Sequence, residues 1–241
     1  MATNKIRVAT LCSGYDSQLM ALARLRDMAG ADKFDFECVA WSEIDKAAVQ
    51  AHNAIFHDLA DKNLGDMTKI DWTKVGDIDL LTYSTPCTDI SSAGQQKGLA
   101  QDSGTRSSIL WYTENAIRIK RPKYLLMENV KALVQTKFMP YFQEWLKVLE
   151  SYGYRNFWQV LDATDYGVAQ HRERVFVISI LDEDAQYEFP EPIELTKCID
   201  DYLETAVQES YFLDQSRVDT LIEKVISGKT SNMPDSEDDG I

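Results

Sequence analysis

Hydrophobic and polar positions along residues 6–180 follow a pattern that predicts strands and helices in turn. Short apolar runs predict strands, and stretches with apolar positions at helical spacing predict helices between them. The strands are predicted at 6–11, 36–41, 78–83, 124–129, 155–163 and 174–180, and the helices at 18–29, 45–56, 107–120 and 141–153. This alternation predicts an α/β fold with a mostly parallel sheet and helices on both faces.

Several predicted helices carry residues that mark their ends. Asp45 is a good N-cap for the second helix, because its short carboxylate can accept from the free backbone N–H groups of the first turn. Gly30 is a plausible C-cap for the first helix, and Pro122 stops the third.

The pattern changes at about residue 182. The stretches "EFPEPIELTKCIDDYLE" and "DQSRVDTLIEKVIS" predict a loop and two modest helices. The last stretch, "GKTSNMPDSEDDGI", is predicted to be disordered because it is polar and acidic. We therefore expect a main domain at 1–181, a helical extension at 182–228 and a disordered tail at 229–241.

The net charge of −14 weakly disfavours a nucleic-acid binder, because neutralising phosphates requires lysine and arginine. The charge is uneven along the chain, however. The segments "LDEDAQYEFPEPIE" and "PDSEDDG" hold much of the acid, whereas "IRIKRPK" and "QHRERV" are locally basic. A local basic site therefore remains compatible with the composition.

The four cysteines are widely scattered and form no CxxC pair, which is typical of a reducing compartment. The three histidines are not at ligand spacing with any cysteine, so no metal is expected. No apolar run approaches the length of a membrane span, and the start of the chain lacks a secretory signal pattern. We expect a cytoplasmic protein that does not enter a membrane.

Chemically useful residues follow the predicted strands one after another. Taken singly, each has an ordinary structural explanation: a turn, a helix cap, a small buried thiol or a solvated edge. Together they are expected to meet, because parallel strands end at one edge of the sheet and ligands bind there. The residues are Cys12, Ser13, Gly14 and Tyr15, then Glu43 and Asp45, Asp66, Pro86 and Cys87, Glu128 and Asn129, and Arg172 and Arg174.

The residue types in this set indicate attack on a pyrimidine. An acid after the second strand suits ribose hydroxyls, and a glycine turn without the full GxGxxG pattern suits an adenosine cofactor that lacks a pyrophosphate. A thiolate is a strong carbon nucleophile. A neighbouring carboxyl group can donate to a ring nitrogen, and an arginine can hold a carbonyl oxygen or a phosphate.

The sequence resembles the cytosine-5 DNA methyltransferases over residues 6–181. The order and spacing of the matching stretches are those of the family, and Pro-Cys, Glu-Asn-Val and Gln-x-Arg-x-Arg in one chain form a specific combination. The stretches are "VATLCSGYDS", "VAWSEIDKAA", "GDMT", "DLLTYSTPCTDIS", "GLAQDSGTRSSILW", "YLLMENVKAL" and "DATDYGVAQHRERVFVISI". The resemblance implies the Rossmann-like fold of S-adenosylmethionine-dependent methyltransferases, with residues 1–181 as the catalytic domain.

The resemblance also implies catalytic roles. Cys87 adds to C6 of cytosine, so that C5 takes the methyl group, and Glu128 contacts N3 and N4 of the base. Arg174 binds O2, while Arg172 steadies a loop or a phosphate. The partner is double-stranded DNA with the target cytosine flipped out, and residues 88–106 form a mobile loop that closes over it.

The implied cofactor is S-adenosyl-L-methionine, which leaves as S-adenosyl-L-homocysteine. In this resemblance Glu43 holds the ribose, Ile44 lies against the adenine and Asp66 binds the adenine amino group. The full set of cofactor residues is Cys12, Ser13, Gly14, Tyr15, Glu43, Ile44, Asp66, Met67, Pro86 and Ile109.

The sequence departs from the family pattern at three places. Thr88 stands where the family often has glutamine, and "CSGYDS" carries fewer glycines than usual. After residue 210 nothing matches the target-recognition domain or the last Gly-Asn motif. Three explanations stay open: a truncated gene product, one half of a split enzyme whose second chain supplies the recognition domain, or a fragment. In each case we expect weak cofactor binding by this chain alone.

Three other functions compete with DNA methylation as explanations of the sequence. A partner-dependent module that binds S-adenosylmethionine without catalysis stays open, although Cys87, Glu128, Arg172 and Arg174 are all present. A transfer-RNA methyltransferase of the same superfamily is disfavoured, because "ENVKALVQTKFMPYF" lacks the Cys-Phe-Thr signature. A nicotinamide-dependent oxidoreductase is disfavoured by the absent glycine fingerprint.

Overall fold

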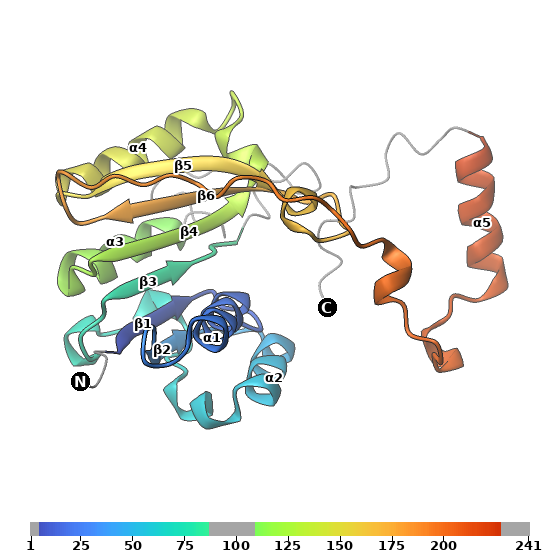
Figure 1. Cartoon of the computed structure of the whole chain (residues 1–241), viewed down its shortest axis with the longest axis horizontal. Coiled ribbons are helices and arrows are strands. Elements are labelled where there is room, and N and C mark those ends of the chain that lie inside the picture. Colours follow the sequence, from blue (N-terminus) through green and yellow to red (C-terminus); the bar gives the residue numbers. More distant parts are fainter. Residues whose placement is uncertain (1–4, 87–108, 228–241) are drawn as a thin grey trace. The chain divides into compact units, whose positions relative to one another are not determined.

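Six strands form a sheet in the order β2-β1-β3-β4-β6-β5 (Figure 1). The computed structural model describes residues 5–86 and 109–227. The strands are β1 (Ile6–Leu11), β2 (Phe36–Ser42), β3 (Leu80–Tyr83), β4 (Tyr124–Val130), β5 (Arg155–Asp162) and β6 (Glu173–Ile180). Strands β1 to β4 pair in parallel, and β6 is antiparallel to both of its neighbours. The predicted mostly parallel α/β sheet is confirmed.

The helices begin and end close to the predicted positions. They are α1 (Ser17–Ala29), α2 (Lys46–Ile55), α3 (Leu110–Lys120), α4 (Met139–Ser151) and α5 (Gln215–Ile226). Short 3-10 helices lie at His57–Lys62, Met67–Lys69, Trp72–Lys74, Lys131–Val134, Ala163–Tyr166, Ile199–Tyr202 and Glu209–Tyr211. Both predicted caps are confirmed: the Asp45 carboxylate accepts from Ala48 N, and Gly30 has a φ of 89°.

Helices cover both faces of the sheet, as the alternation of side chains along β1 shows. Val8 packs with Leu19 of α1 in one buried cluster. The next residue, Ala9, belongs to a second cluster together with Trp111 of α3 and Trp145 of α4. Because successive strand residues point to opposite faces, α1 lies on one face and α3 and α4 on the other, as Figure 1 shows.

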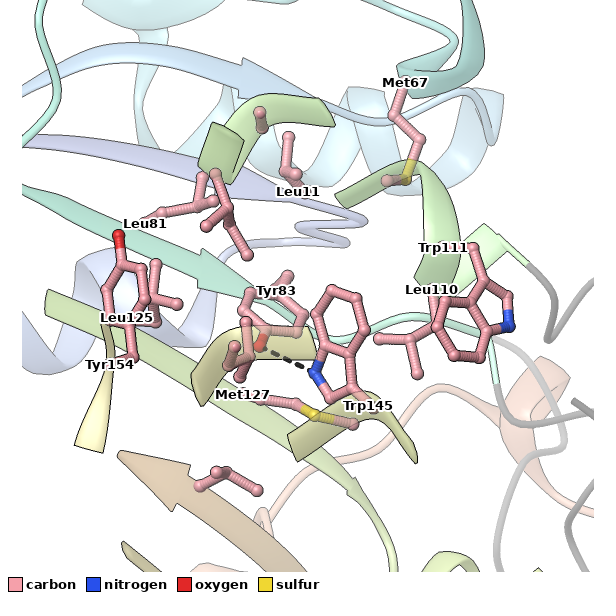
Figure 2. Packing of buried hydrophobic residues seen from close by; sticks show 14 of the residues in the cluster. Leu11, Met67, Leu81, Tyr83, Leu110, Trp111, Leu125, Met127, Trp145 and Tyr154 are labelled. Atoms are coloured by element: carbon pink, nitrogen blue, oxygen red, sulfur yellow. Dashed lines mark hydrogen bonds between the residues drawn. The ribbon is translucent and has the colours of Figure 1, made fainter. Parts of the chain in front are cut away.

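The larger cluster places aromatic residues directly beneath the end of β3 (Figure 2). Trp145 is fully buried, and its indole Nε1 donates to the hydroxyl of Tyr83 at 3.2 Å. The rings of Tyr83 and Trp111 each meet the Trp145 ring edge to face. This packing fixes the last residue of β3, from which the chain continues to Pro86.

Replacing Trp145 with alanine is expected to destabilise the protein by about 3–5 kcal/mol, because a large aromatic leaves a cavity and the Tyr83 hydroxyl loses its donor. Chemical denaturation monitored by circular dichroism measures this change. Trp158 is the matched control, since it is 42% exposed on β5. A loss at Trp145 no larger than that of Trp158→Ala contradicts the assigned role.

The chain divides into two compact units. The first comprises the residues up to Asp162 together with Glu173–Glu191, and the second comprises Ala163–Arg172 and the described residues from Pro192 onward. The whole sheet belongs to the first unit. In the ranges 5–86 and 109–227, no helix is both long and apolar enough to cross a bilayer.

The second unit differs in part from the sequence prediction. Of the two modest helices predicted there, one is α5, whereas the other is only the 3-10 turn Ile199–Tyr202. Its apolar residues Ile199, Tyr202 and Leu203 are exposed. A short helix is marginal without an apolar face to bury, and this explains the single turn. The predicted tail at 229–241 lies outside the described residues.

Candidate active site

The carboxyl ends of β1 to β4 lie at one edge of the sheet. In the register, Leu11 pairs with Ser42 and with Tyr83, and Tyr83 pairs with Met127. Because β6 runs antiparallel to β4, its first residues lie at the same edge, where Arg174 pairs with Val130. The residues that follow the four parallel strands are therefore brought together with the start of β6.

The loop after β1 is a tight turn with unusual backbone angles. Cys12, Gly14 and Asp16 all have positive φ, at 51°, 57° and 68°. For a residue other than glycine this region costs about 1–2 kcal/mol. The turn is tied to β2 by Ser13 N, which donates to Ser42 O at 3.2 Å. No described atom lies within 4 Å of the place where a Cβ on Gly14 would sit, so the face of the turn at Gly14 is open.

The carboxylate of Glu43 joins this turn to the segment between β2 and α2. One oxygen accepts from Gly14 N at 3.0 Å, and the other accepts from Ile44 N and Asp45 N at 2.7 and 2.9 Å. Three of the roughly four lone-pair positions of the carboxylate are thus used. The carboxylate keeps capacity for a further donor, and the Ile44 side chain beside it is 69% exposed.

Asn63 fixes a third segment at the same edge. Its side-chain amide donates to Glu43 O and accepts from Glu43 N, both at 3.2 Å. Its oxygen also accepts from Gly65 N at 2.9 Å. The chain that follows, with Asp66 and Met67, is thereby held beside the end of β2. Asn63 is not among the residues predicted from the sequence, although an asparagine two residues before a glycine is a signal for an Asx turn.

Met67 and Asp66 face different surroundings. Met67 is buried, and its Sδ lies 3.4 Å from the Cys12 Sγ. Asp66 accepts from the backbone and hydroxyl of Thr68 and pairs with Lys69 at 2.9 Å. These contacts lower the pKa of Asp66, and the hydrogen bond from the Thr68 hydroxyl has the largest effect. Burial, followed by the charge of Glu43, raises the pKa of Cys12 to about 12, so this thiol stays neutral.

The backbone after β3 is held from three sides. Ser84 N donates to Leu11 O at 3.3 Å, and the Ser84 hydroxyl accepts from the Gln18 side chain of α1 at 2.8 Å. The buried amide of Asn129 in β4 donates to Thr85 O at 3.1 Å. The chain is therefore fixed up to Pro86. Cys87, the predicted nucleophile, lies outside the described residues, as does the predicted mobile loop at 88–106.

Glu128 and Arg174 form an ion pair between β4 and β6. The Arg174 Nε lies 3.1 Å from the Glu128 Oε1, and the side chains are 6% and 24% exposed for Arg174 and Glu128, respectively. In the antiparallel register the two positions are diagonal neighbours on one face. The pair thus places a nearly buried guanidinium and a partly accessible carboxylate on one face of the sheet. Glu128 is next in sequence to Asn129, which holds the backbone at Thr85.

Two other predicted residues make different contacts. Ile109, just before α3, is partly buried and packs against the main hydrophobic cluster. Arg172 belongs to the second unit, where its carbonyl oxygen accepts from Ala163 N at 3.1 Å. Arg172 and Arg174 thus belong to different units despite their spacing of two residues.

The fold is that of α/β proteins in which ligands bind beyond the carboxyl ends of the strands. The family model for C-5 cytosine-specific DNA methylases matches residues 6–236, and the chain belongs to this family.

Individual relatives agree with this assignment. The chain is 50% identical over 157 residues to the type II methyltransferase M2.ScrFI of Lactococcus lactis subsp. cremoris. This alignment covers 65% of this chain and 44% of the relative. It is 42% identical over 167 residues to the orphan methyltransferase M.SssI of Spiroplasma monobiae, covering 68% and 43%. The chain thus spans less than half the length of these two relatives.

Solved structures share the fold. The S. pombe Dnmt2 methyltransferase aligns with a TM-score of 0.66 at 20% identity, covering 91% of this chain and 66% of that one. The Entamoeba histolytica methyltransferase EhMeth aligns with a TM-score of 0.67 at 18% identity, covering 93% and 67%. At these identities the likeness establishes the Rossmann-like fold alone.

Proposed function

We propose that this chain is the catalytic part of a DNA (cytosine-5)-methyltransferase, which transfers a methyl group from S-adenosyl-L-methionine to C5 of cytosine. The observation that carries the proposal is the Glu128–Arg174 pair. A carboxyl group and a guanidinium at fixed separation suit the N3–N4 edge and the O2 of one pyrimidine ring. Asn129, next to Glu128, holds the backbone that leads to Cys87.

The cofactor residues are proposed on the same edge, and the turn after β1 fits an adenosine ligand. Gly14 leaves open space in front of the turn, and the Glu43 carboxylate retains capacity for a ribose hydroxyl. S-adenosyl-L-methionine supplies an electrophilic methyl group on sulfur and leaves as S-adenosyl-L-homocysteine. The proposed set is Cys12, Ser13, Gly14, Tyr15, Glu43, Ile44, Asp66, Met67, Pro86 and Ile109.

The chain's own residues perform the covalent chemistry in this proposal. The Cys87 thiolate adds to C6 of cytosine, and the electron pair of the C5–C6 bond becomes available at C5. Glu128 takes up a proton from water when the base binds, donates it in a hydrogen bond to N3 and accepts from the N4 amino group, while Arg174 holds O2, so charge on the ring is stabilised. After methylation, C5 gives its proton to water, the electron pair of that bond re-forms the C5–C6 double bond, and the Cys87 thiolate leaves C6. Arg172 is proposed to contact a phosphate or the closing loop.

At a concentration of S-adenosyl-L-methionine high enough to offset the weak cofactor binding expected of this chain alone, the protein incubated with duplex DNA is expected to yield 5-methyldeoxycytidine, because the Cys87 adduct makes C5 the nucleophile. Mass spectrometry of the digested nucleosides measures the product, and parallel reactions with transfer RNA test the RNA alternative. Reaction without S-adenosyl-L-methionine is the control. If cofactor binds and no methylated base forms, the alternative of a partner-dependent binding module is favoured.

The proposed partners are double-stranded DNA with a flipped cytosine and a target-recognition region, supplied by a second chain or by further polypeptide. The second unit supports the proposal of such a recognition region, because exposed apolar side chains are typical of interaction surfaces. In its described part it exposes Tyr211, Phe212, Val225 and Ile226.

The proposed location is the cytoplasm, where DNA is accessible and thiols stay reduced. Cys12, Cys38 and Cys198 are free thiols.

A further inference from the structure

A fully buried carboxylate lies directly behind the turn that is proposed to bind the cofactor. The Asp16 side chain accepts from the Thr10 hydroxyl at 2.6 Å and from Leu19 N at 3.1 Å. Its Oδ2 also lies 3.6 Å from Nε2 of His52, which is itself fully buried. Asp16, Thr10 and His52 thus form a polar cluster inside an otherwise apolar part of the sheet.

The cluster closes the base of the turn. Cys12 to Tyr15 lie between Thr10 and Asp16 in the sequence, and the hydrogen bond between these two side chains joins the ends of the turn. A second bond, from Asp16 N to Ser13 O at 2.7 Å, tightens it further. The turn is therefore held in its strained shape from behind, while its front at Gly14 stays open.

His52 connects the cluster to the second cofactor segment. It lies on α2, whose N-cap is Asp45, and its ring stacks on Trp41 with centroids 3.6 Å apart. Trp41 precedes Ser42 and Glu43 at the end of β2. Neither ring nitrogen of His52 has a hydrogen bond of normal geometry to a described residue. The Asp16 carboxylate lies 3.6 Å from Nε2 of this ring, in contact but beyond hydrogen-bond distance.

We propose that Asp16 is a positioning residue for cofactor binding, which closes the turn Cys12–Tyr15 through its bond from Thr10 and lies against His52 of α2. The inference rests on the proposed function, since it concerns the same cofactor site. A helix cap alone does not require this arrangement, because an exposed carboxylate or hydroxyl caps a helix without the cost of burying a charge. A buried polar group that joins two segments is suited to fixing their relative position.

The charge state of the cluster follows from its surroundings. Burial raises the pKa of Asp16 to about 6, although the hydrogen bonds from Thr10 and Leu19 act in the opposite direction and lower it. Burial lowers the pKa of His52. Cys38 of β2 also faces the cluster, and it remains a neutral thiol because burial, followed by the charge of Asp16, raises its pKa to about 12. The Lys62 ammonium group donates to the carbonyl oxygen of Cys38. At neutral pH an ionised Asp16 thus faces a neutral imidazole.

The test is Asp16→Asn in the full chain, with the dissociation constant of S-adenosyl-L-homocysteine measured by saturation-transfer NMR titration. Asparagine keeps one oxygen for Leu19 N and tolerates positive φ, but it replaces the bond from Thr10 to a charged oxygen with a neutral bond, in which the new NH₂ group donates to the Thr10 hydroxyl. The expected result is a dissociation constant about tenfold weaker, the size of one hydrogen bond to a charged group. Asp214→Asn is the control, because Asp214 caps α5 in the second unit; it should leave the constant unchanged.

The pH profile separates positioning from a purely structural role. Relative to Asp16→Asn, wild-type affinity should fall as pH decreases through about 6, because the carboxyl group gains a proton there. Stability should respond oppositely. The folded state binds the proton more tightly than the unfolded chain, so the contribution of Asp16 to stability rises as pH decreases through the same range.

Equal dissociation constants for Asp16→Asn and the wild type, with parallel pH profiles, overturn the inference even if the variant is less stable. If Asp16→Asn does not fold, Thr10→Val keeps the cap and removes only the bond at the base of the turn. An affinity of Thr10→Val equal to wild type then overturns the inference. If the wild type binds no S-adenosyl-L-homocysteine, the proposed cofactor site itself fails, and this inference fails with it.

Discussion

Replacing Cys87 with serine is expected to abolish the covalent complex between this protein and duplex DNA that carries 5-fluorocytosine. The wild-type thiolate adds to C6. After methyl transfer, C5 carries fluorine in place of the proton that must be removed to release the enzyme, so the adduct persists. A serine hydroxyl is a much weaker carbon nucleophile than a thiolate. Denaturing electrophoresis with S-adenosyl-L-methionine present detects the complex, and peptide mass spectrometry locates the bond.

Cys198→Ser is the matched control for this experiment. Cys198 is an exposed free thiol in the second unit, so it reports any non-specific reaction of cysteine with the modified DNA. Trapping by Cys198→Ser should equal that of the wild type. Persistence of the complex in Cys87→Ser, or a bond mapped to another cysteine, contradicts the assignment of the nucleophile.

The fold was predictable because its elements depend on local pattern. Buried parallel strands are continuous apolar runs, and α1 and α2 carry their own cap residues, so both kinds of element were located within a few positions. Strand β3 is shorter than predicted and begins at Leu80. Just before it, the Asp79 carboxylate accepts from the backbone and guanidinium of Arg7, 72 residues away. Such a distant polar contact has no signal in local periodicity.

The candidate site was predictable only in part, for the same reason. Parallel strands place their carboxyl ends at one edge, so the meeting of Gly14 and Glu43 followed from strand order. The bonds that hold this edge come from Asn63 and Asn129, which reach partners 20 and 44 residues away. The antiparallel direction of β6, which brings Arg174 to Glu128, also depends on tertiary packing and not on the sequence period.

Replacing Glu128 with glutamine is expected to lower the rate of methyl transfer by about 10²–10⁴-fold, the range for loss of a general acid. Glutamine keeps the size of the side chain and one donor, but it cannot deliver a proton toward N3. Single-turnover transfer of labelled methyl groups to DNA measures the change. The dissociation constant for cofactor should stay near that of the wild type, because the Glu43 segment is untouched.

The same substitution leaves Arg174 without its opposing charge, so stability should fall as well. Removing one partner of a buried pair costs about 3–5 kcal/mol, and the partial exposure of Glu128 places the expected loss at the lower end or below. Glu173→Gln is the control, because the neighbouring Glu173–Lys131 pair, at 2.7 Å, is more exposed. Its change should stay within about 0.5 kcal/mol with an unaltered rate. Equal losses of rate in both variants would show that Glu128 acts through the charge of this edge in general and not at the base.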